Sequence, residues 1–168
     1  MTAPKPEPTP PPRLLFVCLG NICRSPTAEA VTRALAADRG LAMTLDSAGT
    51  GNWHIGHPPD PRMQAAAERA GYDLSSLRAR QVTPADFTRF DVVFAMDRQN
   101  LADLEALRPP QNGAQALADL RLFRSHDPEG GTGRHGDVPD PYLEGGFDQV
   151  LRLIERTSGA LLDALNAR

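Results

Sequence analysis

Short apolar runs alternate along this chain with longer segments in which apolar residues recur every three or four positions. The apolar runs predict β-strands, and the periodic segments predict α-helices. The expected strands are residues 14–17, 43–47, 91–96 and 119–123, and the expected helices are residues 26–39, 63–70, 101–107 and 146–165. Strands that alternate with helices in this way form parallel sheets covered by helices. We therefore expect an α/β fold, a three-layer sandwich built on a doubly wound parallel sheet of about four strands.

Chemically useful side chains stand at the ends of three expected strands. Cys18, Ser47 and Asp97 each end or follow such a run. In open parallel sheets, ligands bind beyond the carboxyl ends of the strands. We therefore expect these three residues to lie near one another in the folded chain.

The loop between the first strand and the first helix reads Cys18-Leu19-Gly20-Asn21-Ile22-Cys23-Arg24-Ser25-Pro26. Such a loop can turn successive backbone N–H groups inward as an anion cradle, and a helix N-terminus adds positive potential. A thiol there is expected to react as a thiolate, and Arg24 to grip two oxygens of a phosphate. This predicts a phosphate-binding loop after strand 1 and phosphoryl transfer through a phosphocysteine. The alternative is a buried cysteine ending a core strand, with a surface arginine on the next helix.

Cleavage of a phosphate ester also needs a proton for the departing oxygen. The aspartates considered for this role are Asp60, Asp97, Asp127, Asp137 and Asp140. Three of them precede a proline, and an Asp-Pro pair favours turns. From the residues alone, each aspartate taken singly is better explained as a turn residue, and nothing selects one of the five as the general acid.

The loop resembles the signature of the low-molecular-weight protein tyrosine phosphatases. Further segments follow in that family's order and approximate spacing: Asp46-Ser47-Ala48-Gly49-Thr50, Pro59-Asp60-Pro61-Arg62, Arg78-Ala79-Arg80-Gln81, Ala95-Met96-Asp97 and Asp140-Pro141-Tyr142. The likeness extends from Leu14 nearly to the C-terminus. It implies a protein tyrosine phosphatase that hydrolyses phosphotyrosine, an aryl phosphate monoester, with no metal and no cofactor.

The resemblance also implies three catalytic roles. Cys18 would be the nucleophile, Arg24 the phosphate clamp and Asp140 the general acid and base. The remaining loop residues would surround the phosphate: Leu19, Gly20, Asn21, Ile22, Cys23 and Ser25.

Supporting residues follow from the same resemblance. Asn21 would hold an unusual loop conformation, with Ser47 as its hydrogen-bond partner, because asparagine tolerates positive φ. Ser25 would donate a hydrogen bond to the Cys18 thiolate; alternatively it is a plain N-cap, with Pro26 as the first helical residue. Asp97 would be an acid near the loop, or simply the cap of the next helix.

The walls of the substrate cleft are predicted to be aromatic. Trp53 and Tyr142 are the expected walls, and Trp53 lies in a Gly-rich loop. Two positions depart from the family pattern. Leu77 stands where the family usually has a histidine that completes the loop network, so we expect a shorter network. Leu143 stands where a second aromatic residue is common.

Composition adds boundaries to this picture. The length of 168 residues suggests one domain, and we expect a disordered Pro-rich tail over residues 1–12 and a catalytic domain over residues 13–168. A net charge of −3 gives no reason to expect a nucleic-acid partner. No apolar run is long enough for membrane insertion, and no signal peptide is seen. A cytoplasmic location is expected, since a thiolate enzyme needs a reducing compartment.

Several alternatives remain open from the sequence. One is an arsenate reductase served by an external thiol, and another is a non-catalytic module that binds phosphotyrosine. Cys23 is either a small buried residue or the partner of Cys18 in a reversible disulfide. His54 and His57 are expected to be surface residues and not metal ligands. The expected partner is a phosphotyrosine-containing protein, with a tyrosine kinase as a candidate, and the chain is expected to be a monomer or weak dimer.

Overall fold

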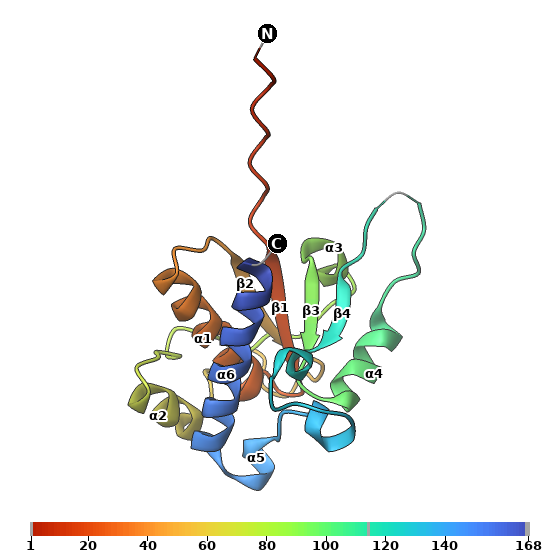
Figure 1. Cartoon of the computed structure of the whole chain (residues 1–168). Helices are drawn as coiled ribbons and strands as arrows, with labels where there is room; N and C mark the ends of the chain where they lie inside the picture. The colour runs from red at the N-terminus through yellow and green to blue at the C-terminus, as the bar shows by residue number, and fades with distance from the viewer. Residues whose placement is uncertain (1, 114, 167–168) are drawn as a thin grey trace.

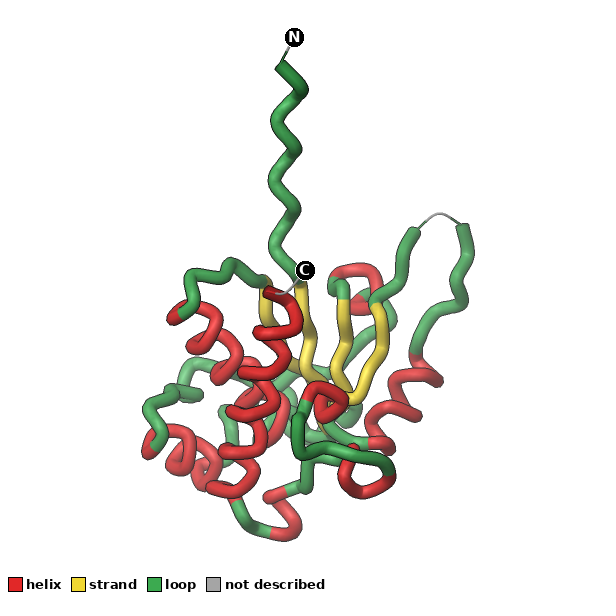
Figure 2. Tube along the Cα trace, viewed as in Figure 1, coloured by secondary structure: helices red, strands yellow, loops and turns green. Residues whose placement is uncertain are grey.

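The computed structural model describes residues 2–113 and 115–166, and it contains a four-stranded parallel sheet (Figures 1 and 2). The strand order is β2-β1-β3-β4. The strands are β1 (Arg13–Cys18), β2 (Thr44–Gly49), β3 (Val92–Ala95) and β4 (Asp119–Leu122). Every expected strand is therefore present, and the fold class is confirmed.

Helices cover both faces of the sheet. One face carries α1 (Arg24–Asp38), α2 (Pro61–Arg69) and α6 (Phe147–Asn166). The other face carries α3 (Asp86–Arg89) and α4 (Arg98–Leu107). Short elements complete the chain: η1 (Phe123–His126), η2 (Gly133–Gly136) and α5 (Pro141–Glu144). Figure 1 shows α5 beyond the end of the sheet at which the strand arrows point.

The central strand β1 is buried on both sides, which explains its continuous apolar sequence. Phe16 packs on the α1 and α6 side with Phe94 and Phe123, whereas Leu15 and Val17 belong to the core under α3 and α4. Each fully buried aromatic or aliphatic side chain of this kind contributes about 1.5–3 kcal/mol to the free energy of folding. The strand that carries the loop is thereby fixed in the middle of the core.

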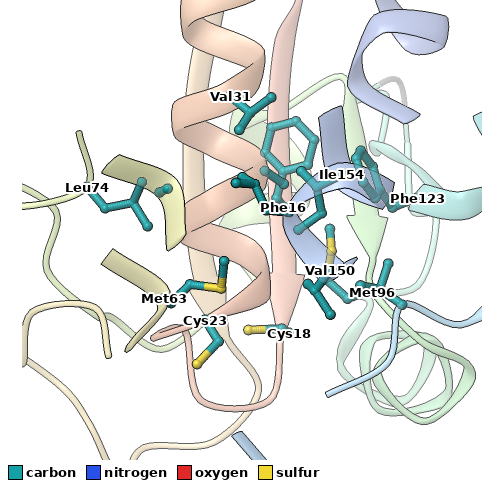
Figure 3. Close-up of a cluster of buried hydrophobic side chains, with 14 of the residues drawn as sticks. Phe16, Cys18, Cys23, Val31, Met63, Leu74, Met96, Phe123, Val150 and Ile154 are labelled. Atoms are coloured by element: carbon teal, nitrogen blue, oxygen red, sulfur yellow. The ribbon is translucent and has the colours of Figure 1, made fainter. Parts of the chain in front are cut away.

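The chain leaves β1 toward β2 through α1, and it leaves β3 toward β4 through α4. The connections diverge at this point, so a crevice opens beyond the carboxyl ends of β1 and β3. Cys18 ends β1 and Asp97 follows β3. Figure 3 shows Cys18 and Cys23 on the two sides of the loop from β1 to α1, at the margin of the buried hydrophobic cluster.

The start of α1 differs from the expectation. The helix begins at Arg24, and its N-cap is Cys23, which makes no side-chain capping hydrogen bond. Ser25 and Pro26 therefore lie inside the first turn and are not N-cap and first residue. The capping interpretation of Ser25 was wrong because its hydroxyl bonds to other side chains of the loop.

Residues 2–12 are extended and lead away from the body of the molecule (Figure 1). They form no helix or strand, and their side chains are exposed except at Pro12. Within the described residues, no helix has the length and apolar character needed to cross a bilayer.

Candidate active site

A pocket of about 290 Å³ lies at the carboxyl end of β1. Its walls combine the loop, the Gly-rich segment after β2 and the start of α5. The lining residues are Cys18, Leu19, Gly20, Ile22, Cys23, Arg24, Trp53, His54, Asp140, Tyr142 and Leu143. The structure therefore brings together all three predicted catalytic residues and both predicted aromatic walls.

The phosphate loop (residues 18–24) has a strained turn at its centre. Asn21 has φ of 56° and is the one non-glycine residue with positive φ among the described residues. This conformation aims the Asn21 backbone N–H at Cys18 Sγ, over 3.2 Å. Gly49 presses on the loop from β2, since a Cβ there would come within 2.7 Å of the Leu19 carbonyl oxygen. Nothing larger than glycine fits that contact.

A directed chain of hydrogen bonds supports the thiol from behind. Asn21 Nδ2 donates to Ser25 Oγ over 2.7 Å and to Ser47 Oγ over 3.0 Å. Ser25 Oγ lies 3.0 Å from Cys18 Sγ. Because Ser25 accepts from Asn21, its own proton can go to the sulfur or to the Ala48 carbonyl oxygen, which lies farther away at 3.4 Å. Asn21, Ser25 and Ser47 are all buried and stand behind the pocket wall.

The chain of hydrogen bonds continues beyond Ser47 to a side chain of α1. Ser47 Oγ donates to Glu29 Oε1 over 2.7 Å, and Glu29 Oε2 accepts from Arg33 over 2.8 Å. Leu77 packs at the edge of the hydrophobic core and takes no part. The Glu29 carboxylate of α1 thus links the loop network to Arg33, one helical turn further along the helix.

A second anchor reaches Asn21 from the segment after α2. The Arg80 backbone N–H donates to Asn21 Oδ1 over 3.0 Å. The Arg80 guanidinium is itself held by Asp46 and by the fully buried Asp86. Both ends of the Asn21 amide are therefore fixed, and so is the positive φ that shapes the loop.

Arg24 is 3% exposed and is held between acidic and carbonyl groups. Its Nη1 donates to Asp97 Oδ2 over 2.6 Å and to the Val138 carbonyl over 3.0 Å, and Nη2 lies 3.7 Å from Asp140 Oδ2. Burial alone would lower the pKa of Arg24, but the nearby negative charge of Cys18 and the bond to Asp97 raise it overall. Arg24 stays cationic at the pocket floor.

Asp97 combines the two roles that were proposed for it. Its Oδ1 accepts from the Asn100 backbone N–H and caps α4, while Oδ2 accepts from Arg24. One carboxylate thus ties the start of α4 to Arg24, so the capping and the near-loop interpretations both hold.

The five candidate acids separate by their partners. Asp60 is bound by Arg62, Asp127 by Arg124 and Arg156, Asp137 by Arg98, and Asp97 by Arg24. Asp140 alone of the five lines the pocket. It caps α5 by accepting from the Tyr142 backbone N–H over 3.1 Å, with Pro141 between them. This geometry places its carboxyl at the pocket wall opposite the thiol loop.

Cys23 also lines the pocket, and both cysteines are free thiols. Burial is the main reason that the pKa of Cys23 is raised well above its usual range, and the charge of Asp60 adds to it. Cys23 is therefore a neutral thiol at neutral pH and a poor nucleophile. Its disulfide with Cys18 stays a prediction.

The upper walls of the pocket are exposed. Trp53 is 66% exposed, Tyr142 48% and Leu143 77%. The Arg62 guanidinium lies over the Tyr142 ring at 5.5 Å and over Phe147 at 4.8 Å. Cation–π contacts of this kind hold the Tyr142 wall against α2 and α6.

His54 is a lining residue that the sequence interpretation did not include. The His54 ring is half-buried, lies over Gly20 and is 6.2 Å from the Tyr142 ring. His57 is exposed, and the two Nδ1 atoms are 3.4 Å apart. Among the described residues, no group of three potential metal ligands occurs.

Comparison with known proteins identifies one family. The family model described as "Low molecular weight phosphotyrosine protein phosphatase" matches residues 13–168. A low molecular weight protein-tyrosine-phosphatase of Streptomyces coelicolor is 46% identical, over 91% of this chain and 93% of that protein. The human low molecular weight phosphotyrosine protein phosphatase is 40% identical, over 89% of this chain and 93% of that protein.

Solved structures agree with the sequence matches. The crystal structure of YfkJ from Bacillus subtilis superposes with a TM-score of 0.83 at 38% identity, and the match covers 95% of this chain and 97% of that one. The order of strands and helices described above is therefore shared with a solved relative over nearly its whole length.

Proposed function

Because this chain belongs to the low molecular weight phosphotyrosine protein phosphatase family, we propose that it hydrolyses phosphotyrosine through a phosphocysteine intermediate. Cys18 is the nucleophile, Arg24 the phosphate clamp and Asp140 the general acid and base. The enzyme class is protein-tyrosine phosphatase, a phosphoric monoester hydrolase that uses no metal.

In the first step the Cys18 thiolate attacks phosphorus, forming the S–P bond as the P–O bond to the phenol breaks. Asp140 gives its proton to the departing phenolate oxygen. Arg24 and the inward N–H groups of the phosphate loop hold the equatorial oxygens and stabilise the charge of the transition state. The 3.7 Å approach of Arg24 to Asp140 supports this division of roles within one pocket.

In the second step a water molecule attacks the phosphocysteine. Asp140, now ionised, takes a proton from this water, and the S–P bond breaks to release phosphate and the thiolate. Ser25 stabilises the departing thiolate from 3.0 Å. The reaction consumes one water molecule and leaves the enzyme unchanged.

One observation carries the proposal: the thiol, the buried guanidinium and the one pocket-lining candidate acid converge on a single pocket. The pocket walls of Trp53 and Tyr142 suit an aryl ring. An arsenate reductase served by an external thiol would need the same loop but has no use for aromatic walls. A binding module without catalysis has no use for Asp140. Both alternatives are therefore less well supported.

We also propose that residues 13–168 form the catalytic domain and residues 1–12 a tail. The substrate is a phosphotyrosine-bearing protein, with a tyrosine kinase as one candidate, and the enzyme acts in the cytoplasm because a catalytic thiolate needs a reducing compartment. A monomer or weak dimer is expected.

The test is hydrolysis of phenyl phosphate by the reduced protein in the presence of a chelator. Cys18→Ser is expected to abolish turnover while phosphate still binds, and Asp140→Asn to reduce kcat by about 10²–10⁴-fold. The loss in Asp140→Asn is expected to shrink with p-nitrophenyl phosphate, whose leaving group needs no proton. Substantial turnover by Cys18→Ser, or no turnover by the wild-type enzyme, would refute the mechanism.

A further inference from the structure

A second cavity, of about 240 Å³, adjoins the pocket described above. Trp53 and Leu19 line both cavities. The lining residues are Leu19, Thr50, Gly51, Trp53, Gln81, Val82, Asp103 and Leu107. We call this cavity the flanking subsite. The flanking subsite does not include Cys18, Arg24 or Asp140, and it meets the first pocket at Leu19 and Trp53.

The partition between the cavities is positioned by a missing side chain. A Cβ on Gly51 would lie 2.0 Å from Trp53 Cζ3 and 2.3 Å from Cε3. The indole therefore rests on the Gly51 backbone. The ring can stand between the two cavities only because position 51 carries no side chain.

The lining of the flanking subsite is mixed: it has aliphatic and aromatic side chains, the polar residues Thr50 and Gln81, and one acidic residue. Leu19, Val82 and Leu107 contribute aliphatic surface, and Asp103 is the one charged residue in its lining. Asp103 is exposed and accepts a hydrogen bond from Gln99 Nε2 over 3.0 Å. Among the described residues it forms no ion pair, so its charge is not compensated within the chain.

We propose that the flanking subsite binds the side chain of a lysine or arginine next to the phosphotyrosine of a protein substrate. This inference rests on the proposed function and adds to it a preference for the residue that flanks the phosphotyrosine. A long basic side chain places its aliphatic stem on apolar walls and its cation near a carboxylate. Adjacent residues of an extended peptide lie about 3.3–3.6 Å apart along the chain, so a neighbour of the phosphotyrosine reaches past the Trp53 indole.

The experiment compares phosphopeptides that differ only in one flanking residue. Pairs with lysine or glutamate at each of the two positions before and after phosphotyrosine are hydrolysed by the wild-type enzyme. At one or more of these positions we expect kcat/KM to favour lysine by about fivefold, the size typical of an exposed charge pair. p-Nitrophenyl phosphate serves as the reference substrate.

Two charge reversals on α4 distinguish an effect of the Asp103 carboxylate in the subsite from an effect of the protein's overall charge. Asp103→Lys is expected to remove or invert the preference for lysine, and Asp103→Asn to reduce the ratio toward one. Glu105→Lys is the matched control, because Glu105 is exposed on the same helix but does not line the cavity. All three variants are expected to hydrolyse p-nitrophenyl phosphate as the wild-type enzyme does.

The possible outcomes decide the proposal. A lysine preference that is lost in Asp103→Lys and kept in Glu105→Lys supports the subsite. No preference in the wild-type enzyme, a preference for glutamate, or equal loss in both reversals overturns it. If p-nitrophenyl phosphate is not hydrolysed at all, the proposed function fails and the subsite with it, whereas normal turnover without a preference overturns the subsite alone.

Discussion

The floor and the rim of the catalytic pocket are built in opposite ways. The pocket floor, by which we mean Cys18 and Arg24 together with Asn21 and Ser25 directly behind them, is buried, and each of its side chains is bound by others. The pocket rim (Trp53, His54, Tyr142 and Leu143) is half-buried or exposed and held mainly by ring contacts. The difference separates two tasks. Charge stabilisation needs fixed groups in a dry site, whereas substrate choice needs surface that a partner can reach.

The floor also depends on residues that never touch the pocket. Glu29 and Arg80 hold the two sides of the Asn21 network from α1 and from the segment after α2. The rim depends on Gly51, whose backbone contacts the Trp53 ring, and on Arg62, whose guanidinium lies over the Tyr142 ring. Changes at the floor are therefore expected to lower kcat, and changes at the rim to raise KM.

Replacing the clamp at the floor is expected to have the largest effect. Arg24→Lys keeps the positive charge but loses the planar fork that binds two phosphate oxygens. We expect kcat for phenyl phosphate to fall by about 10³-fold, the scale of losing a preorganised donor in the transition state. Thermal unfolding serves as the control for folding. A loss below tenfold would contradict the assignment of Arg24.

A cluster of ion pairs around Asp127, which does not line the pocket, tests whether effects on stability and on catalysis can be separated. Burial alone would raise the pKa of Asp127, but hydrogen bonds from Arg156 and Arg124 outweigh it and hold this pKa well below its usual range. The stabilising contribution is therefore present above the unfolded-state pKa of about 3.9 and is lost as pH falls through the lower folded-state pKa. Asp127→Asn is expected to cost about 2 kcal/mol at pH 7, with partly exposed partners limiting the loss.

Urea unfolding of the wild type and Asp127→Asn between pH 7 and pH 2 measures this difference. The gap between the two proteins is expected to close as the pH falls below about 4. The kcat/KM of the folded variant is expected to match the wild type. A gap that does not change with pH would show that the ion pairs do not carry the effect.

An intermediate effect is expected at the far end of the floor network. Glu29→Gln keeps the shape of the side chain but replaces the carboxylate that orders Ser47 and, through it, Asn21. We expect kcat to fall by about tenfold, corresponding to about 1.4 kcal/mol, with little change in KM. Steady-state kinetics with p-nitrophenyl phosphate measures both constants.

Arg33→Gln is the matched control, since it removes the exposed partner of Glu29, together with its bond to the Leu45 carbonyl, and leaves the Glu29–Ser47 bond in place. Its effect on kcat is expected to be less than threefold, as for most surface ion pairs. Equal losses of kcat in the two variants would show that the charge of Arg33, and not the Glu29–Ser47 bond, is responsible for the effect on kcat.

The smallest effect is expected at the rim. Trp53→Leu removes an aromatic wall and is expected to raise KM for aryl phosphates about fivefold, equivalent to about 1 kcal/mol of ring contact, with kcat nearly unchanged. An alkyl phosphate substrate should show no such change in KM. A fall in kcat instead of a rise in KM would contradict the prediction, because it would show that Trp53 acts in the chemical step and not in substrate binding.

Local patterns in the sequence predicted much of the secondary structure. Continuous apolar runs predicted the central strands β1 and β3, because a strand buried on both faces needs apolar residues at nearly every position. The edge strands β2 and β4 mix polar and apolar residues, and they were expected from shorter apolar patterns. The start of the first helix was predicted less accurately. Ser25 was expected to be the N-cap, but α1 begins at Arg24 and the Ser25 hydroxyl contacts the Cys18 thiol. The resemblance supplied Asp140, which the residues alone left among five candidates.

The sequence by itself determined the elements, their order and the composition of the phosphate loop, since these depend on neighbours in the chain. Only the tertiary structure decided which aspartate lines the pocket, what ends the Asn21 network and where the flanking subsite lies. These depend on contacts such as the bond from Arg24 to the Val138 carbonyl, 114 residues along the chain. Contacts over that separation are set by the packing of the sheet and its helices, and no local pattern encodes them.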